Sequence, residues 1–257
     1  MTVWIDQPSW PAHGRHFAHL ISDSSYEELH ELARRAELPV RAFDGDHYDV
    51  PDARWHEVVA AGARPTDGLD LARRLNASGL RLRKRRGDRG VARRLGVPIP
   101  GGPGHVDLVL SDQPVDPARV MGAMLFVRDA VGSFAAVYSI RRGQWGSPGG
   151  GREPGEDPLV TAVRETQEET GLVVASDTVV ACGYERFTPL HPGGPISTRA
   201  PYLQAYRTRL RATAPALSDG DSGIRETRWM SPGEYAAHCR PLFWWPLAVA
   251  VFPELAG

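Results

Sequence analysis

The sequence predicts an α/β protein with two domains, the larger being an α/β/α sandwich with a mixed sheet. Strand-like segments lie both before and after one well-delimited helix at residues 158–170. Residues 1–80 hold a strand, helices and turns of their own, which predicts a small separate α/β domain. Residues 81–102 are basic and rich in proline and glycine, as a linker is. We therefore expect domains at 1–80 and 103–257.

Length and composition describe an ordinary globular protein. The 257 residues suit one large domain or two small ones, and the hydrophobic fraction of 42% and charged fraction of 24% are typical of globular chains. The net charge of −1 indicates no general attraction to nucleic acids or membranes. Two cysteines, Cys182 and Cys239, make no disulfide framework, which favours a reducing compartment. No signal peptide is visible, so we expect a cytoplasmic protein.

The helix at residues 158–170 is defined by its ends and by two faces. Asp157 suits the N-cap, Pro158 the first helical position and Gly171 the C-terminal stop. The 100° step of a helix puts Leu159, Val160 and Val163 on one side. The same step brings together the carboxylates of Glu165, Glu168 and Glu169 on the other, with Arg164 beside Glu168.

These carboxylates are either a solvated acidic face or a metal site. The preceding turn, residues 148–151, holds three glycines, which let backbone carbonyls approach an ion, and Glu156 adds a carboxylate at the helix entry. Clustered oxygen ligands beside an open position suit Mg²⁺, which keeps water and phosphate oxygens in its coordination shell. We therefore favour a magnesium site.

The spacing of these residues resembles the signature of the Nudix hydrolases, which cleave nucleoside diphosphates linked to another moiety. The matching pattern is Gly150-x5-Glu156-x7-Arg164-Glu165-x2-Glu168-Glu169-x-Gly171-Leu172. Thr166 departs from it, since the family usually has an aliphatic residue there; we place Thr166 at the rim of the apolar face and expect a small stability cost. The resemblance covers about residues 104–257. It implies an α/β/α fold and hydrolysis that depends on Mg²⁺, with Mn²⁺ as the alternative ion.

The resemblance also implies roles for individual residues. Glu165, Glu168 and Glu169 would be metal ligands with the Gly150 carbonyl close by, and either Glu165 or Glu169 would be the general base. Arg164 would orient these carboxylates, and Glu156 would support them or bind an additional ion. Many family members use a further acid from outside the signature. Here Glu226 is our first candidate and Glu185 the second, the alternative for each being an ordinary surface acid.

The substrate is expected to be a small molecule built on a nucleoside diphosphate. Arg141 and Arg142, which directly precede the active loop, could hold a phosphate, and Trp145 is a further candidate substrate-binding residue. The position of Pro189 loosely resembles the ADP-ribose-cleaving branch, so ADP-ribose or a nucleotide sugar leads and an oxidised nucleoside triphosphate follows. The loop at 188–198 would be a lid. The alternative function is a non-catalytic nucleotide-ligand sensor coupled to the N-terminal domain.

The N-terminal segment, about residues 2–75, resembles a small bacterial domain of unknown function. The matching pieces include Val3-Trp4-Ile5-Asp6 and His47-Tyr48-Asp49. Histidine and aspartate together can bind a metal or move protons. They can equally be surface groups and caps. A second site would use Asp6, His19, His47 and Asp49.

Partners other than the substrate have weak support in the sequence. The basic run at 81–94 could bind phosphate backbones, but it lacks interleaved aromatic residues, so we expect no nucleic acid. We expect no membrane partner, and a homodimer stays an open alternative.

Overall fold

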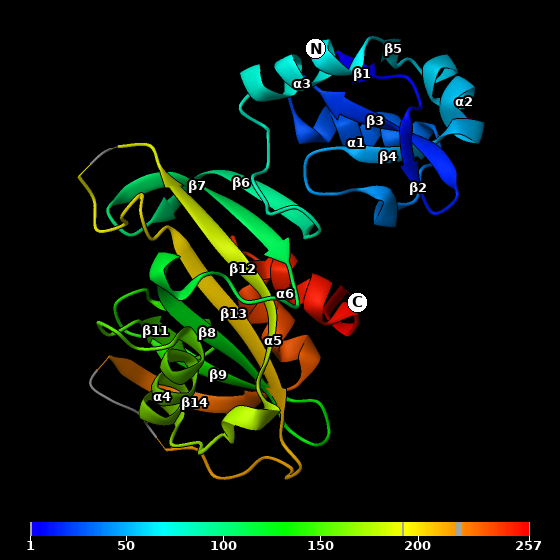
Figure 1. The fold of residues 1–257 in the computed structure, drawn as a ribbon. Helices are drawn as coiled ribbons and strands as arrows, with labels where there is room; N and C mark the ends of the chain where they lie inside the picture. Colours follow the sequence, from blue (N-terminus) through cyan, green and yellow to red (C-terminus); the bar gives the residue numbers. More distant parts are fainter. Residues whose placement is uncertain (1, 192, 219–222, 257) are drawn as a thin grey trace. The chain divides into compact units, whose positions relative to one another are not determined.

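The computed structural model describes residues 2–191, 193–218 and 223–256 (Figure 1). The chain forms two compact units, and the boundary in the sequence falls between Arg93 and Arg94. Each unit has its own sheet and core, which agrees with an α/β protein that carries an additional N-terminal α/β region. None of the helices in the described residues is long and apolar enough to cross a membrane.

The first unit is a five-stranded sheet with helices on both faces. Its strand order is β2-β3-β1-β5, with β4 paired to β3. The strands are β1 (Val3–Ile5), β2 (Trp10–Ala12), β3 (Arg15–Ser22), β4 (Tyr48–Pro51) and β5 (Arg64–Pro65). The helices are α1 (Tyr26–Arg35), α2 (Trp55–Ala60) and α3 (Gly68–Ala77).

Successive side chains of β3 pack into different cores on the two faces of this sheet. Leu20 packs into one core with Leu29 of α1 and Val58 of α2. Ile21, the next residue, packs into a second core with Leu71 and Leu75 of α3. Successive side chains of a strand point to opposite faces, so α1 and α2 cover one face and α3 the other.

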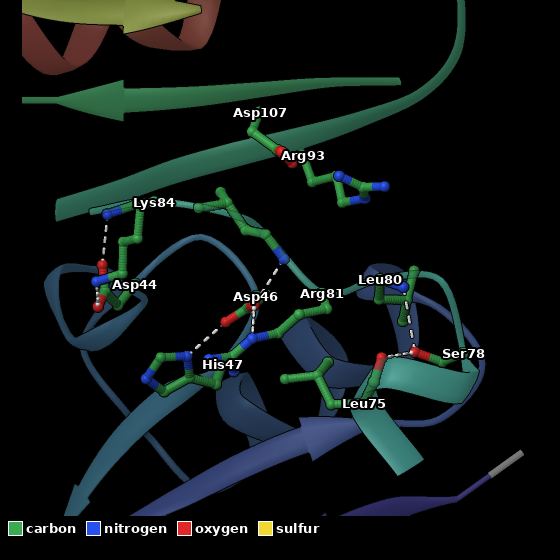
Figure 2. Close-up of polar contacts among 12 residues, drawn as sticks. Asp44, Asp46, His47, Leu75, Ser78, Leu80, Arg81, Lys84, Arg93 and Asp107 are labelled. Carbon is green, nitrogen blue, oxygen red and sulfur yellow. Dashed lines mark hydrogen bonds and ion pairs between the residues drawn. The ribbon is translucent and has the colours of Figure 1, made fainter. Parts of the chain in front are cut away.

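The structure differs from the expected linker at 81–102. Asp46 accepts a hydrogen bond of 2.7 Å from the Leu82 amide, and Asp44 accepts one of 2.5 Å from the Gly90 amide. Asp44 also pairs with Lys84 (Figure 2). Asp44 and Asp46 of the first unit thus fix the backbone of the basic run at two positions. Strands β6 (Arg89–Ile99) and β7 (Gly102–Leu110) then follow without a free connecting segment.

The second unit is a nine-stranded mixed sheet between helices, as predicted. Its strand order is β10-β9-β8-β13-β12-β7-β6, with β11 paired to β8 and β14 to β9. The β8–β13 pair is parallel and the β12–β13 pair antiparallel. The remaining strands are β8 (Val120–Arg128), β9 (Phe134–Ser139), β10 (Gln144–Gly146), β11 (Gly149–Gly151), β12 (Val180–Pro189), β13 (Tyr202–Arg209) and β14 (Ile224–Met230).

Helix α4 (Pro158–Thr170) covers one face of this sheet, and α5 (Pro232–Cys239) and α6 (Trp245–Val251) cover the other (Figure 1). Leu125 of β8 packs in one core with Ala162 of α4. The next residue, Phe126, faces the opposite way, and its ring lies 6.1 Å from that of Trp244. The sheet therefore holds α4 against β8 and β11, where the acidic residues lie.

Both cysteines are buried and free. Cys182 lies in β12 and Cys239 at the end of α5. Burial raises the pKa of each thiol to about 12, because a thiolate would lose its hydration there. Neither thiol is therefore reactive at neutral pH.

Candidate functional site

Helix α4 begins and ends where the sequence predicts. The Asp157 side chain accepts a hydrogen bond of 2.9 Å from the Leu159 amide, and Pro158 is the first helical residue. At the other end Gly171 has a φ of 72°, a left-handed conformation that glycine adopts without strain, and its amide donates to the Gln167 carbonyl. Both caps are confirmed.

The buried face of α4 differs from the expected one. Val160 is 50% exposed, whereas Thr166, expected at the rim, is fully buried. The hydroxyl of Thr166 donates to the Ala162 carbonyl at 2.7 Å, and that of Thr170 donates to the Thr166 carbonyl at 2.5 Å. A helix carbonyl therefore satisfies each hydroxyl, and a threonine can take a core position where its polar atom would otherwise be costly.

The guanidinium of Arg164 holds three carboxylates and one carbonyl together, and we call this arrangement the Arg164 clamp. Its Nη1 donates to Glu165 Oε1 and Glu168 Oε2, each at 2.9 Å. Its Nε donates to Glu156 Oε1 at 2.9 Å, and its Nη2 donates to Glu156 Oε2 at 3.1 Å and to the Gly151 carbonyl at 3.0 Å. One planar cation thus fixes the helix, the loop before it and β11 in one geometry.

The glycines of β11 allow the backbone to lie directly against the carboxylates. A Cβ atom at Gly150 would be 2.4 Å from the carboxyl carbon of Glu165, closer than real Cβ contacts, so this position needs a glycine. The neighbouring Gly149 amide donates to Glu169 Oε2 at 2.9 Å. The structure thus brings Gly150, Glu165 and Glu169 to one place, with Glu168 joined to Glu165 through Arg164.

The carboxylates carry more negative charge than the nearby cation balances. Arg164 lowers the pKa of Glu156 to about 2 through its hydrogen bonds. Burial raises the pKa of Glu169 to about 7, against the hydrogen bond from Gly149 and the charge of Arg142, and burial raises the pKa of Glu165 as well. Excess negative charge on converging oxygens is the donor chemistry that a hard divalent cation needs, so these residues fit one.

The two acids outside the signature have different surroundings. Glu185 in β12 is 2% exposed, and burial raises its pKa to about 8 against the charge of Arg142, which acts on Glu169 too. Glu226 in β14 pairs with Arg228, and its side chain is 46% exposed. Arg142 therefore links Glu185 electrostatically to the carboxylate group, whereas Glu226 has a partner of its own.

The three expected substrate-binding residues also have different surroundings. Arg141 and Arg142 are exposed on the turn between β9 and β10. Trp145 is 8% exposed, its ring lies 5.5 Å from that of Tyr138, and Arg228 lies over it at 4.8 Å. The structure thus gives Trp145 a packing position, which its place in a short strand next to two arginines could not reveal.

In the first unit, the structure brings the four expected residues Asp6, His19, His47 and Asp49 together. Oxygen or nitrogen atoms of His19, His47 and Asp49 lie within 4.8 Å of one another, and Asp6 bonds His19. Another histidine of this unit, His30, instead lies 2.8 Å from the Tyr48 hydroxyl through its Nδ1. Sequence reasoning missed Asp46, whose role depends on its burial beside His47.

Family models match both units of the chain. Residues 3–78 match a protein of unknown function (DUF4031), and residues 118–249, about half of the chain, match the NUDIX domain. A search of curated proteins found no significant match.

Many solved structures resemble the second unit, at low identity. The Bacillus subtilis pyrophosphohydrolase BsRppH is 16% identical with a TM-score of 0.44, over 59% of this chain and 91% of that one. The NUDIX domain of Shewanella oneidensis NrtR, complexed with ADP ribose, is 15% identical with a TM-score of 0.40, over 56% and 94%. A C. elegans Ap4A hydrolase is 16% identical with a TM-score of 0.37, over 49% and 92%. Because the NUDIX family model matches about half of the chain, the protein belongs to the Nudix family. It is a Nudix pyrophosphohydrolase, and a DUF4031 domain precedes its Nudix domain.

Proposed function

We propose that the protein hydrolyses a pyrophosphate bond in a nucleoside diphosphate derivative and uses Mg²⁺, with Mn²⁺ as the alternative ion. ADP-ribose or a nucleotide sugar is the leading substrate, and an oxidised nucleoside triphosphate follows. The observation that carries the proposal is the Arg164 clamp, which holds Glu156, Glu165 and Glu168 in fixed positions. An acidic face that is only solvated does not require its carboxylates to be held in fixed positions.

In this proposal Glu165, Glu168 and Glu169 hold the ion, with the Gly150 carbonyl beside them. Bound there, a divalent ion would neutralise phosphate oxygens and lower the pKa of a water. Glu165 and Glu169 both have a raised pKa because of burial, so either carboxylate can accept the proton of the attacking water. Arg164 keeps the carboxylates oriented, and Glu156, bonded by Thr161 Oγ1 at 2.8 Å, anchors Arg164 in turn.

The substrate phosphates would meet Arg141 and Arg142, which are exposed on the turn between β9 and β10, and the charge of Arg142 acts on Glu169. Strand β12 extends through Pro189, so the first two residues of the expected lid at 188–198 belong to this strand. Residue 192 of that lid lies outside the described residues. Of the two additional acids, we favour Glu185 over Glu226 as a further ligand, because Arg142 connects Glu185 to Glu169.

The competing function is a sensor that binds a nucleotide derivative without hydrolysing it. A sensor could dispense with the clamped carboxylates, and their presence favours catalysis. A panel of nucleoside diphosphate derivatives, assayed with Mg²⁺ and a coupling phosphatase for released phosphate, separates the two. We expect turnover of at least one substrate and none with EDTA. Saturable binding of a panel member with no turnover in Mg²⁺ or Mn²⁺ would establish the sensor instead.

Glu185 leads to a prediction on stability and pH. Its pKa in the folded protein, about 8, exceeds the ordinary value of 4.5, so the folded state keeps a proton that the unfolded state releases. Wild-type stability should therefore fall as the pH rises from 4.5 to 8, and Glu185→Gln removes this penalty. We expect the metal-free variant to gain about 2–4 kcal/mol more at pH 8 than at pH 5.

Denaturant unfolding at the two pH values, with EDTA present, measures this difference. Glu226→Gln is the matched control, because that side chain is 46% exposed and should show no comparable pH dependence. An equal stability change at both pH values for Glu185→Gln would show that Glu185 is ionised in the folded protein.

A further inference from the structure

Three strands of the first unit place acid and imidazole side chains in one row across its sheet. His19 of β3 lies directly opposite Asp49 of β4 in the antiparallel ladder. Asp6 follows β1 and continues the β1–β3 ladder, with its amide donating to the His19 carbonyl at 3.2 Å. His47 precedes Asp49 by two positions, and its Nε2 lies 3.4 Å from Asp49 Oδ1. The backbone pairing thus gathers these side chains on one side of the sheet.

A carboxylate holds Nδ1 of each imidazole, and Nε2 of each ring is the nitrogen that remains for the proposed ligand set, that of His47 lying beside Asp49. Oδ1 of Asp6 accepts a hydrogen bond of 2.6 Å from the His19 amide, and Oδ2 of Asp6 lies 3.0 Å from His19 Nδ1. Asp46, which is 3% exposed, lies 2.5 Å from His47 Nδ1 (Figure 2). In a ring whose Nδ1–H donates to a carboxylate, a metal ion binds Nε2, and at His47 the ion would replace the Nε2 proton.

Asp46 is itself held rigidly. Its second oxygen accepts the Leu82 amide at 2.7 Å and lies 3.7 Å from Arg81 Nε (Figure 2). This carboxylate is therefore anchored by the basic run that follows α3, and it fixes the ring of His47 in turn. Outer carboxylates that orient ligand histidines in this way are a regular feature of metal sites and raise the basicity of the ligand nitrogen.

We propose that the first unit binds one divalent transition metal ion through Nε2 of His19, Nε2 of His47 and the carboxylate of Asp49. Imidazole ligands favour ions of the zinc class over Mg²⁺, which the carboxylates of the second unit suit better. Ligand atoms around tetrahedral zinc are about 3.3 Å apart. One ring nitrogen of each histidine and one Asp49 carboxylate oxygen already lie within 4.8 Å of one another, so small side-chain adjustments complete the site.

The site has room for a further ligand. The side chains of His19 and Asp49 are 28% and 44% exposed, whereas the orienting carboxylates of Asp6 and Asp46 are 9% and 3% exposed. Three protein ligands with open, solvent-facing positions are typical of a metal site that binds water or a substrate, while a structural zinc site has four protein ligands. The ring of Trp10, 57% exposed, lies 6.3 Å from that of His19 and could contact such a ligand.

The competing description is a network of ion pairs without metal. Burial disfavours the charged form of His47, but hydrogen bonds with Asp46 and Asp49 outweigh it and raise the pKa of His47 to about 9. A protonated His47 between two carboxylates has a hydrogen-bond partner for each ring nitrogen and needs no metal ion. It does not, however, use the free nitrogen of His19, which a metal site requires.

The test is a calorimetric Zn²⁺ titration of the full chain after EDTA treatment and dialysis, with excess Mg²⁺ to occupy the carboxylates of the second unit. Elemental analysis after gel filtration gives the stoichiometry. We expect one equivalent of Zn²⁺ in the wild type that His19→Ala and Asp49→Asn both lose. Asp46→Asn should keep the stoichiometry and weaken binding by about 10- to 100-fold. His16→Ala, an exposed histidine of the same strand, is the control and should bind as wild type does.

Circular dichroism of each variant, compared with that of the wild type, shows that the variant is folded. Asp49→Asn changes a half-exposed side chain by one atom, so it keeps the test valid if a histidine variant unfolds. Equal Zn²⁺ stoichiometry and affinity in wild type, His19→Ala and Asp49→Asn would overturn the proposal, as would no Zn²⁺ binding by the wild type. The outcome is independent of the hydrolase proposal, because different residues in a different unit carry it.

Discussion

Glu168→Gln is expected to lower kcat by roughly a thousandfold, because the several kcal/mol that a bound metal ion contributes to the transition state depend on its charged ligands. Glutamine keeps the size and the helix propensity of glutamate and removes one negative charge. The Glu168 side chain is 47% exposed and receives one hydrogen bond of 2.9 Å from Arg164. Loss of such an exposed pair costs little, and relief of repulsion from Glu165 and Glu169 offsets it, so the thermal midpoint should stay nearly unchanged.

The measurement is initial rate against Mg²⁺ concentration, on a substrate found with the panel. Glu153→Gln is the matched control: it removes the same charge from the loop before the helix, where Glu153 contributes its amide and not its side chain to Glu156. That control should keep wild-type turnover. If Glu168→Gln retained most activity at saturating Mg²⁺, Glu168 would not be a metal ligand.

Arg164→Lys is expected to lower kcat by roughly a hundredfold while keeping the charge. An ammonium group cannot reach Glu156, Glu165, Glu168 and the Gly151 carbonyl at once, as the guanidinium does. The carboxylates then lose their common orientation, and hydrogen bonds to charged groups are lost. Because the clamp is partly exposed, we expect a stability loss of roughly 1–2 kcal/mol.

The same substitution should change the response to acid. Arg164 holds the pKa of Glu156 at about 2, below the ordinary 4.5. Ionised Glu156 therefore stabilises the wild type fully above pH 4.5, and this contribution disappears as the pH falls toward 2. In Arg164→Lys the pKa of Glu156 returns toward its ordinary value, so ionised Glu156 contributes less to the free energy of unfolding. Denaturant unfolding at neutral pH and near pH 3 measures the difference.

Arg152→Lys is the matched control for the clamp. Arg152 lies in the same loop and donates to the backbone carbonyl of Glu156 at 2.8 Å, not to the carboxylates. It should keep wild-type kcat and a wild-type response to acid. An Arg164→Lys variant with unchanged kcat would show that the carboxylates keep their positions without the clamp.

The features that the sequence predicted well depend on residues close together in the chain. Asp157, Pro158 and Gly171 define the ends of α4 through contacts within a few residues, and the structure confirms all three. The convergence of the glutamates follows from the helical step alone. The family match at residues 118–249 then supports the fold and the general activity, while the role of each residue stays a prediction.

The features that the sequence could not predict depend on contacts across the chain. Residues 81–102 have the composition of a linker, but Asp44 and Asp46 order this run from a distant loop, and a strand follows. The charge of Arg142 acts on both Glu185 and Glu169, and this depends on the sheet that places β12. Thr166 was misplaced because its buried hydroxyl is satisfied by a carbonyl of its own helix, which no hydrophobic pattern can indicate.

The two buried thiols make the chain suitable for selective dye labelling without any prior removal of native cysteines. Cys182 and Cys239 each have a pKa of about 12, so a maleimide at neutral pH would react first with a cysteine introduced at the surface. Val40 in the first unit and Val173 in the second are 83% and 81% exposed and offer such positions. Energy transfer between dyes at these two residues would report whether Zn²⁺ or a nucleotide changes the distance between the two units.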